Sequence, residues 1–232
     1  MSSSLLMREI ITKNKIENNY SKRQDRIIKE AVDILVLNLR KIFPYVPITH
    51  EQKLEKTEIA KILHSCNKNC GIYISNNNSF IKPDGGFVFA LIKKKKHLIL
   101  SVEAKKQGTN DIRVKEGKPV QAKGNAIDRL VKNYHEIENY QQNELIFPYI
   151  VFVSGCDFNK YSSIIDRVTS TNFQCEINKI QILKLIAHTK LGKRHLACAS
   201  LFIREKKWNI KEVYKIIKKA AIMSIRYYLE KD

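Results

Sequence analysis

The sequence predicts an α/β protein with a mixed central β-sheet flanked by helices. Along the chain, segments with apolar residues at helical spacing alternate with short segments typical of strands, which are either apolar throughout or apolar at every second residue. A length of 232 residues suits one well-packed domain. With only 8 glycines and 5 prolines, long linkers are not expected. We therefore expect a mobile polar arm over residues 1–20 and a single domain over residues 21–232.

Five segments have the apolar spacing of amphipathic helices. The first follows Ser21, which forms a pattern with Gln24 that resembles a capping box, and it stops before Pro44. The others cover residues 56–64, 125–140, 178–188 and 209–229.

The predicted strands are short and lie between these helices. Residues 87–92 and 97–105 flank the basic turn at residues 93–96 and indicate a β-hairpin. Further strands are expected at residues 71–75, 148–154 and 197–203.

The formal net charge of +19 indicates a polyanionic partner. Nucleic acid is the first candidate and an anionic membrane surface the second, although an AT-rich genome would also enrich a chain in lysine. No apolar run approaches the roughly 20 residues that span a bilayer. The first residues lack the apolar core of a signal peptide, so a cytoplasmic location is expected.

The cysteine content favours reduced thiols. The chain has 5 cysteines, an odd number, and no secretory signal. Cys66 and Cys70 lie near His64, but a second pair of zinc ligands is missing from this spacing, so free thiols are favoured over a structural zinc site.

The segment between residues 81 and 105 carries the groups best suited to catalysis. Asp84 precedes one strand of the predicted hairpin, and Glu103 and Lys105 end the other. Residues two apart on a strand face the same way, so Glu103 and Lys105 are expected to share a face. If the two strands pair, Asp84 can reach the same edge. The expected Glu103 face also holds Ile99 and Ser101, and the opposite face holds Leu98, Leu100, Val102 and Ala104.

Two carboxylates and an ammonium group at one point suit phosphodiester hydrolysis. The carboxylates of Asp84 and Glu103 are hard oxygen ligands suited to one or two Mg²⁺ ions, and the carbonyl of Ala104 could supply a further ligand. Lys105 would hold or deprotonate the attacking water, or stabilise the transition state. The products would carry 5′-phosphate and 3′-hydroxyl ends. The alternative is structural: Asp-Gly-Gly is a common turn, and a Glu-x-Lys pair on a strand is often only a solvated ion pair.

The amino-acid sequence of these segments resembles that of the EcoRI-like type II restriction endonucleases of the PD-(D/E)xK superfamily. The matching motifs are IKPDGG at residues 81–86, EAK at 103–105 followed by Gln107-Gly108, and GNAIDR at 124–129, which resembles the recognition motif. The resemblance extends in the same order from about Lys56 to Phe158 and is looser in the C-terminal third.

The resemblance implies a homodimer that cuts palindromic double-stranded DNA with Mg²⁺. Residues 124–129 would then lie in the major groove, where Asn and Arg side chains bond purine edges. The implied base-recognition residues are Gln107, Gln121, Ala122, Asn125, Ala126, Asp128 and Arg129. The implied DNA-backbone contacts are Asn78, Lys82, Gly124, Lys132 and Asn133. Without the resemblance, Asn125 would be interpreted as a helix N-cap and Arg129 as part of a surface ion pair.

The implied function is that of a type II site-specific deoxyribonuclease, with GAATTC as the first candidate site and a cognate DNA methyltransferase in the same system. Asp128 stands where the family enzyme has Glu, and Lys184 and Leu185 lie where it has arginines. Bare AATT or another flank is therefore the next candidate. Two other functions stay open: a DNA-binding protein with a retired nuclease fold, and a structure-specific repair or junction nuclease.

Overall fold

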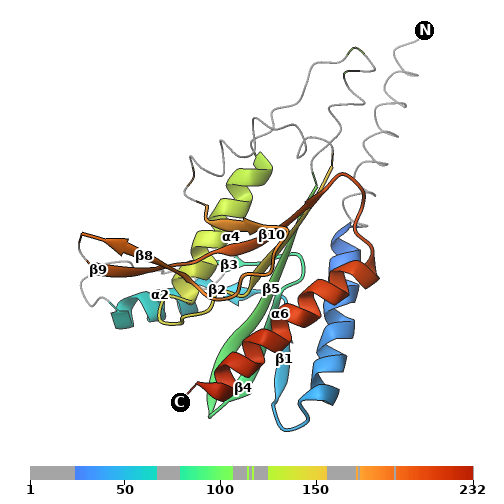
Figure 1. The fold of residues 1–232 in the computed structure, drawn as a ribbon. Helices are drawn as coiled ribbons and strands as arrows, with labels where there is room; N and C mark the ends of the chain where they lie inside the picture. Colours follow the sequence, from blue (N-terminus) through green and yellow to red (C-terminus); the bar gives the residue numbers. More distant parts are fainter. Residues whose placement is uncertain are drawn as a thin grey trace.

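The structure is a computed structural model that describes residues 24–66, 79–106, 114, 117, 125–155, 171, 173–190 and 192–231. A six-stranded sheet with the order β1-β4-β5-β6-β10-β7 forms its centre (Figure 1). β1 pairs antiparallel with β4 and β4 with β5, whereas β5, β6, β10 and β7 run parallel. The predicted mixed sheet is confirmed. The strands are Ile48–Glu51 (β1), Phe87–Ile92 (β4), Lys95–Lys106 (β5), Tyr149–Ser154 (β6), Cys175–Ile177 (β7) and Ala199–Arg204 (β10).

Helices cover both faces of this sheet, and each face has its own apolar core (Figure 1). The helix over residues 24–42 and α6 (Ile210–Glu230) pack on one face. The helices α2 (Lys56–Cys66) and α4 (Asn125–Tyr140) pack on the other. Burial of their apolar stripes is what makes these segments helical in the fold. The four helices agree closely with the sequence prediction. Within the described residues, no helix has the length and apolar character that a membrane span requires.

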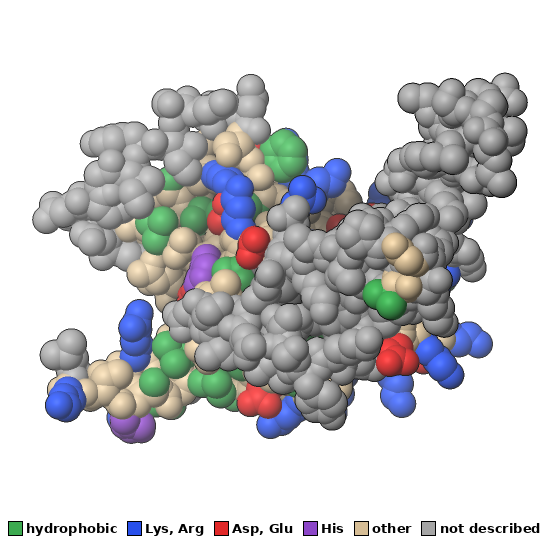
Figure 2. All heavy atoms as spheres, turned by 90° about the horizontal axis from the view of Figure 1, so that it is seen from above, with side chains coloured by type: hydrophobic (Ala, Val, Ile, Leu, Met, Phe, Trp, Pro, Cys, Tyr) green, Lys and Arg blue, Asp and Glu red, His purple; other side chains and the backbone are tan. Residues whose placement is uncertain are grey.

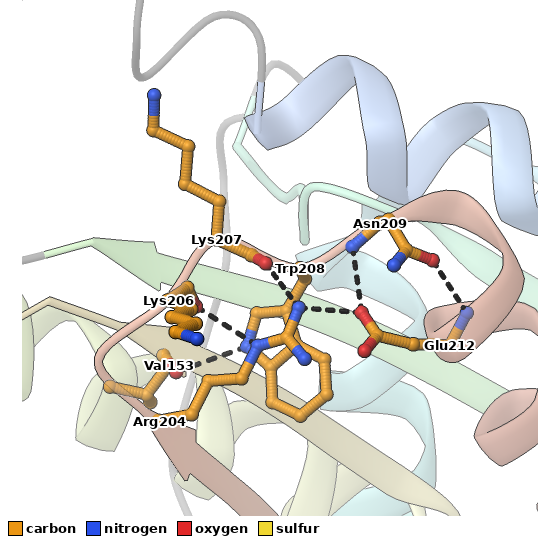
Figure 3. Close-up of polar contacts among 7 residues, drawn as sticks. All are labelled: Val153, Arg204, Lys206, Lys207, Trp208, Asn209 and Glu212. Carbon is orange, nitrogen blue, oxygen red and sulfur yellow. Dashed lines mark hydrogen bonds and ion pairs between the residues drawn. The ribbon is translucent and has the colours of Figure 1, made fainter.

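The start of α6 is fixed to the end of the sheet by a network of polar contacts (Figure 3). Asn209 and Glu212 form a capping box, in which each side chain accepts a hydrogen bond from the other residue's backbone N–H. The Arg204 guanidinium lies 3.8 Å from the Trp208 ring centroid and donates to Glu212 Oε2 at 2.6 Å. The Trp208 indole donates to the Val153 carbonyl at 3.0 Å. These contacts hold the start of α6 against β6, the strand next to β5.

The predicted helix over residues 178–188 is wrong. Asn178 has a left-handed φ of 55°, and the chain then runs without regular secondary structure to Lys184, with Ile182 buried and Ile180 partly buried against the core. An exposed hairpin follows, formed by β8 (Leu185–Thr189) and β9 (Gly192–Leu196), which projects from the body of the molecule (Figure 1). Its apolar residues also fit a helical period, but tertiary pairing gives them a period of two.

Two smaller differences concern segments without a strong pattern. The prediction missed β1 and β7, which extend the sheet at its two edges, and the two-residue pair β2 (Leu54–Glu55) and β3 (Phe80–Ile81). The expected arm and the strand over residues 71–75 lie outside the described residues.

Candidate active site

A tight turn between β3 and β4 places Asp84 beside the end of β5. The Gly86 amide donates to the Pro83 carbonyl at 3.0 Å, and the Gly85 amide donates to the Val102 carbonyl at 2.9 Å. Both glycines are buried. A Cβ on Gly85 would lie 2.8 Å from Val102 Cβ and 2.9 Å from Ile28 Cγ2, so only glycine lets the turn lie against both elements.

Replacing Gly86 with alanine is expected to destabilise the protein by about 1–3 kcal/mol, because the residue would combine strain with a backbone clash. Gly86 has a φ of 67°, and a Cβ there would lie 2.5 Å from the Glu51 carbonyl oxygen. Chemical denaturation of the variant measures this loss. Gly117→Ala is the matched control for φ, because Gly117 has a φ of 65° but an added Cβ would meet nothing within 4 Å. Equal losses in both variants would contradict the steric part of the argument.

The structure brings Asp84, Glu103 and Lys105 together. The Ala104 amide donates to Asp84 Oδ2 at 2.9 Å, which ties the turn directly to β5. The Lys105 ammonium donates to Glu103 Oε1 and lies 4.0 Å from Asp84 Oδ2. The geometry expected from the hairpin is therefore present, with both carboxylates within reach of one ammonium group.

A β-bulge in β5 places two side chains on the face of the sheet opposite to the one predicted. Val88 pairs with Leu100 and Phe89 with Leu98, so Ile99 is an extra residue in the ladder. Ile99 consequently packs in the same core as Leu100, on the face opposite Glu103, and Leu98 packs in the core on the Glu103 side. The predicted sides of Leu98 and Ile99 are wrong. Those of Leu100, Val102 and Ala104 are confirmed, because the bulge precedes them.

Glu103 is an acidic side chain in a packed interior. It is 1% exposed, and burial raises the pKa of its carboxyl from 4.5 to about 7. The neighbouring Asp84 carboxylate also raises this pKa, whereas the Lys105 ammonium and the hydrogen bonds from Lys105 and Asn133 lower it. Desolvation exceeds the attraction to Lys105, so the site favours a compensating cation next to Glu103.

Asn133 joins this cluster from α4. Its amide nitrogen donates to Glu103 Oε2 at 3.1 Å. The sequence suggested Asn133 as a DNA-backbone contact, and its place two turns into the helix gave no sign of a partner on β5. In the structure Asn133 connects the helix that follows the GNAIDR motif to the buried carboxylate.

Two other groups near the cluster were missed by the sequence analysis. Tyr149 on β6 is fully buried, and burial raises the pKa of its hydroxyl, with added effects of Glu103 and Asp84. Asp25, near the start of the first helix, has a raised pKa because of partial burial, with the Asp84 charge as the next cause. Asp25 precedes Ile28, which packs on Gly85, by one helical turn. Contacts of this kind leave no local signal in the sequence.

The donor set fits a divalent cation bound through oxygen. The carboxylates of Asp84 and Glu103 and the carbonyl of Ala104 are hard ligands of the kind that Mg²⁺ prefers, with water completing its shell. Among the described residues there is no group of three or more His, Cys, Asp or Glu side chains placed to hold a metal. A cation here would depend on these two carboxylates.

The structure does not bear on a zinc site at Cys66 and Cys70. The Cys66 side chain and all of Cys70 and Cys156 lie outside the described residues. Cys175 and Cys198 are free thiols, and burial raises the pKa of both, to about 12 and about 11. These two thiols are therefore neutral and suited to packing.

The predicted DNA contacts divide into those the structure describes and those it does not. Lys82, Asp128, Arg129 and Lys132 are exposed, as a DNA-binding role requires. Viewed from above, Lys and Arg side chains lie beside Asp and Glu side chains in the middle of the face (Figure 2). Asn125 and Ala126 begin α4, but their side chains lie outside the described residues, as do Asn78, Gln107, Gln121, Ala122 and Gly124.

A mixed sheet with a Pro-Asp turn and a Glu-x-Lys strand end side by side is the arrangement of restriction-endonuclease-like proteins. Comparison with known proteins agrees with this class. The chain belongs to the EcoRI restriction endonuclease family, because the model of that family, described as restriction endonuclease EcoRI, matches residues 11–232. It is accordingly a type II site-specific deoxyribonuclease, and enzymes of this kind act on double-stranded DNA and generally depend on a divalent metal.

Two curated relatives cover most of the chain. The type II restriction enzyme EcoRI of Escherichia coli is 27% identical over 242 aligned positions, which cover 91% of this chain and 87% of that enzyme. The type II restriction enzyme RsrI of Cereibacter sphaeroides is 28% identical over 239 positions, covering 89% and 85%.

Proposed function

We propose that the protein is a Mg²⁺-dependent endonuclease that cuts both strands of a short palindromic site, as a homodimer with one active site per chain. The observation that carries the proposal is the meeting of Asp84, Glu103 and Lys105 at the end of β5. A palindrome has two-fold symmetry, so a symmetric dimer would present one such cluster to each strand.

The geometry of the cluster supports a role for each of these groups. Asp84, Glu103 and the Ala104 carbonyl would hold Mg²⁺, which supplies charge neutralisation at the phosphate and a more acidic bound water. Lys105 lies next to both carboxylates, where its ammonium can hold the attacking water and stabilise charge on the five-coordinate transition state. Asn133 holds Glu103 from the other side. Attack in line would leave 5′-phosphate and 3′-hydroxyl ends.

Residues at the start of α4 would recognise the DNA sequence. Asn125, Ala126 and Asp128 lie in the first turn of this helix and Arg129 begins the second. A helix N-terminus favours nearby phosphate. The GNAIDR motif supports an AATT core, and GAATTC is our first candidate for the complete site. A cognate methyltransferase would protect host DNA at that site.

The deciding experiment incubates plasmid and phage DNA with the protein in Mg²⁺ and, separately, in EDTA, and sequences the ends. We expect cleavage in Mg²⁺ alone, at one palindromic sequence containing AATT. Asp84→Ala should abolish cutting. Ends without a common sequence would instead indicate a repair or junction nuclease. Binding without cutting in every condition would indicate a retired nuclease.

Arg129 and Lys132 are expected to separate base recognition from backbone contact. Arg129→Ala should weaken binding to the cognate site by about 1–3 kcal/mol and binding to random DNA much less, because a base contact is lost. Lys132→Ala should weaken binding to both DNAs alike and reduce the salt dependence, because a phosphate contact is lost. Competition binding in Ca²⁺ at two salt concentrations measures both effects. Equal losses on both DNAs for Arg129→Ala would remove this residue from base recognition.

A further inference from the structure

We propose that His50 is a positioning residue of the active site, which fixes the turn that carries Asp84; this inference rests on the proposed metal-binding role of Asp84. His50 lies on β1, which pairs with β4 directly after that turn. Its Nε2 lies 2.9 Å from the carbonyl oxygen of Gly85, the residue next to Asp84. The His50 side chain is 12% exposed, so this contact lies largely away from solvent.

The contacts of the imidazole show which ring nitrogen faces the turn and donates the hydrogen bond. A carbonyl oxygen can only accept, so Nε2 carries the hydrogen in the contact with Gly85. The side-chain amide of Gln52 lies 3.3 Å from the same nitrogen. On the other side of the ring, Nδ1 lies 3.4 Å from Asp33 Oδ1 on the first helix. His50 therefore lies between that helix and the turn, and its hydrogen bond is to the turn.

The turn has little freedom once these contacts are made. The Gly85 amide is bound to Val102, the Gly86 amide to Pro83, and the Gly85 carbonyl to His50. Without His50, the Gly85 carbonyl would be a buried acceptor, and the turn would have to shift to satisfy it. Because Asp84 is covalently next to Gly85, such a shift moves its carboxylate relative to Glu103. A residue that holds a metal ligand through its neighbour then sets the metal affinity without touching the metal.

The sequence alone did not single out His50. Its partner is 35 positions away, and the intervening chain contains α2, β2 and β3. The steric fit of Gly86 points to the same packing, because a Cβ there would lie 3.0 Å from His50 Nε2.

The experiment compares the full-length variants His50→Leu, His50→Gln and His97→Gln. His97 is the matched control: it is a histidine of the same sheet with a side chain 10% exposed, and its ring packs at a tilt against Tyr228 in α6, with ring centroids 3.9 Å apart. Two properties are measured on protein without DNA. One is the affinity for Mn²⁺, followed by electron paramagnetic resonance of the free ion. The other is hydrogen–deuterium exchange over residues 83–86. Single-turnover cleavage against Mg²⁺ concentration is the third measurement.

We expect His50→Leu to weaken Mn²⁺ binding by about tenfold and to speed exchange over residues 83–86. His50→Gln should recover part of the loss, because its amide can donate to the Gly85 carbonyl. Cleavage by His50→Leu should recover at high Mg²⁺. His97→Gln should bind Mn²⁺ and exchange in this segment as the wild type does, even where its melting temperature falls.

Equal Mn²⁺ affinity and equal exchange in His50→Leu and His97→Gln would overturn the proposal. If His50→Leu does not fold, the comparison of His50→Gln with His97→Gln decides, since a loss of affinity confined to His50→Gln supports the role and equal affinities overturn it. The two proposals can fail separately. If the wild type binds Mn²⁺ and the His50 variants differ from it as expected, but the wild type cuts no DNA, the proposed function is refuted and the positioning role of His50 stands.

Discussion

Replacing Lys105 with alanine is expected to lower the single-turnover rate of DNA cleavage by about a hundredfold or more. The Lys105 ammonium is the basic group that contacts Glu103 and lies 4.0 Å from Asp84, where charge would develop on the phosphate. Rates are measured with enzyme in excess over a duplex containing the site, at saturating Mg²⁺. Binding of the same duplex in Ca²⁺ should change by much less than the rate.

The control for Lys105→Ala is Lys95→Ala. Lys95 begins the same strand and lies 2.7 Å from Glu144, with its side chain 63% exposed, at the end of β5 remote from Asp84. This variant should cut at the wild-type rate. A Lys105→Ala protein that also cuts at that rate would remove the lysine from the chemistry and leave the two carboxylates as the whole catalytic apparatus.

Glu103→Gln is expected to gain stability relative to the wild type as the pH rises, when both proteins are kept free of metal. Burial raises the pKa of the Glu103 carboxyl from 4.5 to about 7, so the folded protein holds this proton more tightly than the unfolded chain does. The resulting stabilisation is complete below about pH 4.5 and is lost as the pH rises through 7. The loss is on the order of 3 kcal/mol, and glutamine does not undergo it.

Urea denaturation in EDTA at pH 5 and at pH 8 measures the effect as the difference between variant and wild type. Other groups titrate over the same range, but they do so equally in both proteins. Glu205→Gln is the control, because Glu205 is exposed at the end of β10. If wild type and Glu103→Gln lose stability in parallel, then Glu103 stays ionised in the folded protein and Lys105 compensates its burial fully.

The parts of the fold that the sequence predicted are those with a local period. The helix of α4 and the β4–β5 hairpin follow from apolar spacing alone, and the boundaries observed differ from those predicted by at most two residues. Asp84 and Glu103 were placed together by the same reasoning, because a hairpin brings the start of one strand to the end of the other. The GNAIDR motif needed the resemblance, since Asn at a helix start is equally an N-cap.

The parts that were not predicted depend on contacts between distant segments. The bulge at Ile99 reflects pairing with β4, and nothing in the alternation of β5 marks it. The β8–β9 hairpin depends on a chain reversal near Gly192, whose φ is 119°. Asn133 and His50 acquire their roles from partners 30 and 35 positions away. Local patterns therefore located the candidate catalytic residues but not the side chains that contact them from distant segments.

The contact of Lys105 with Glu103 also has a consequence for the protein before any metal arrives. Its ammonium serves as an internal counter-ion, which partly offsets the mutual repulsion of the Asp84 and Glu103 carboxylates beside the end of β5. Dialysis against a chelator should thus leave a folded, preassembled centre that regains activity at once when Mg²⁺ is returned. When Asp84 and Glu103 hold a divalent cation, that cation would supply the same offset, and the Lys105 ammonium would then be available to a bound phosphate.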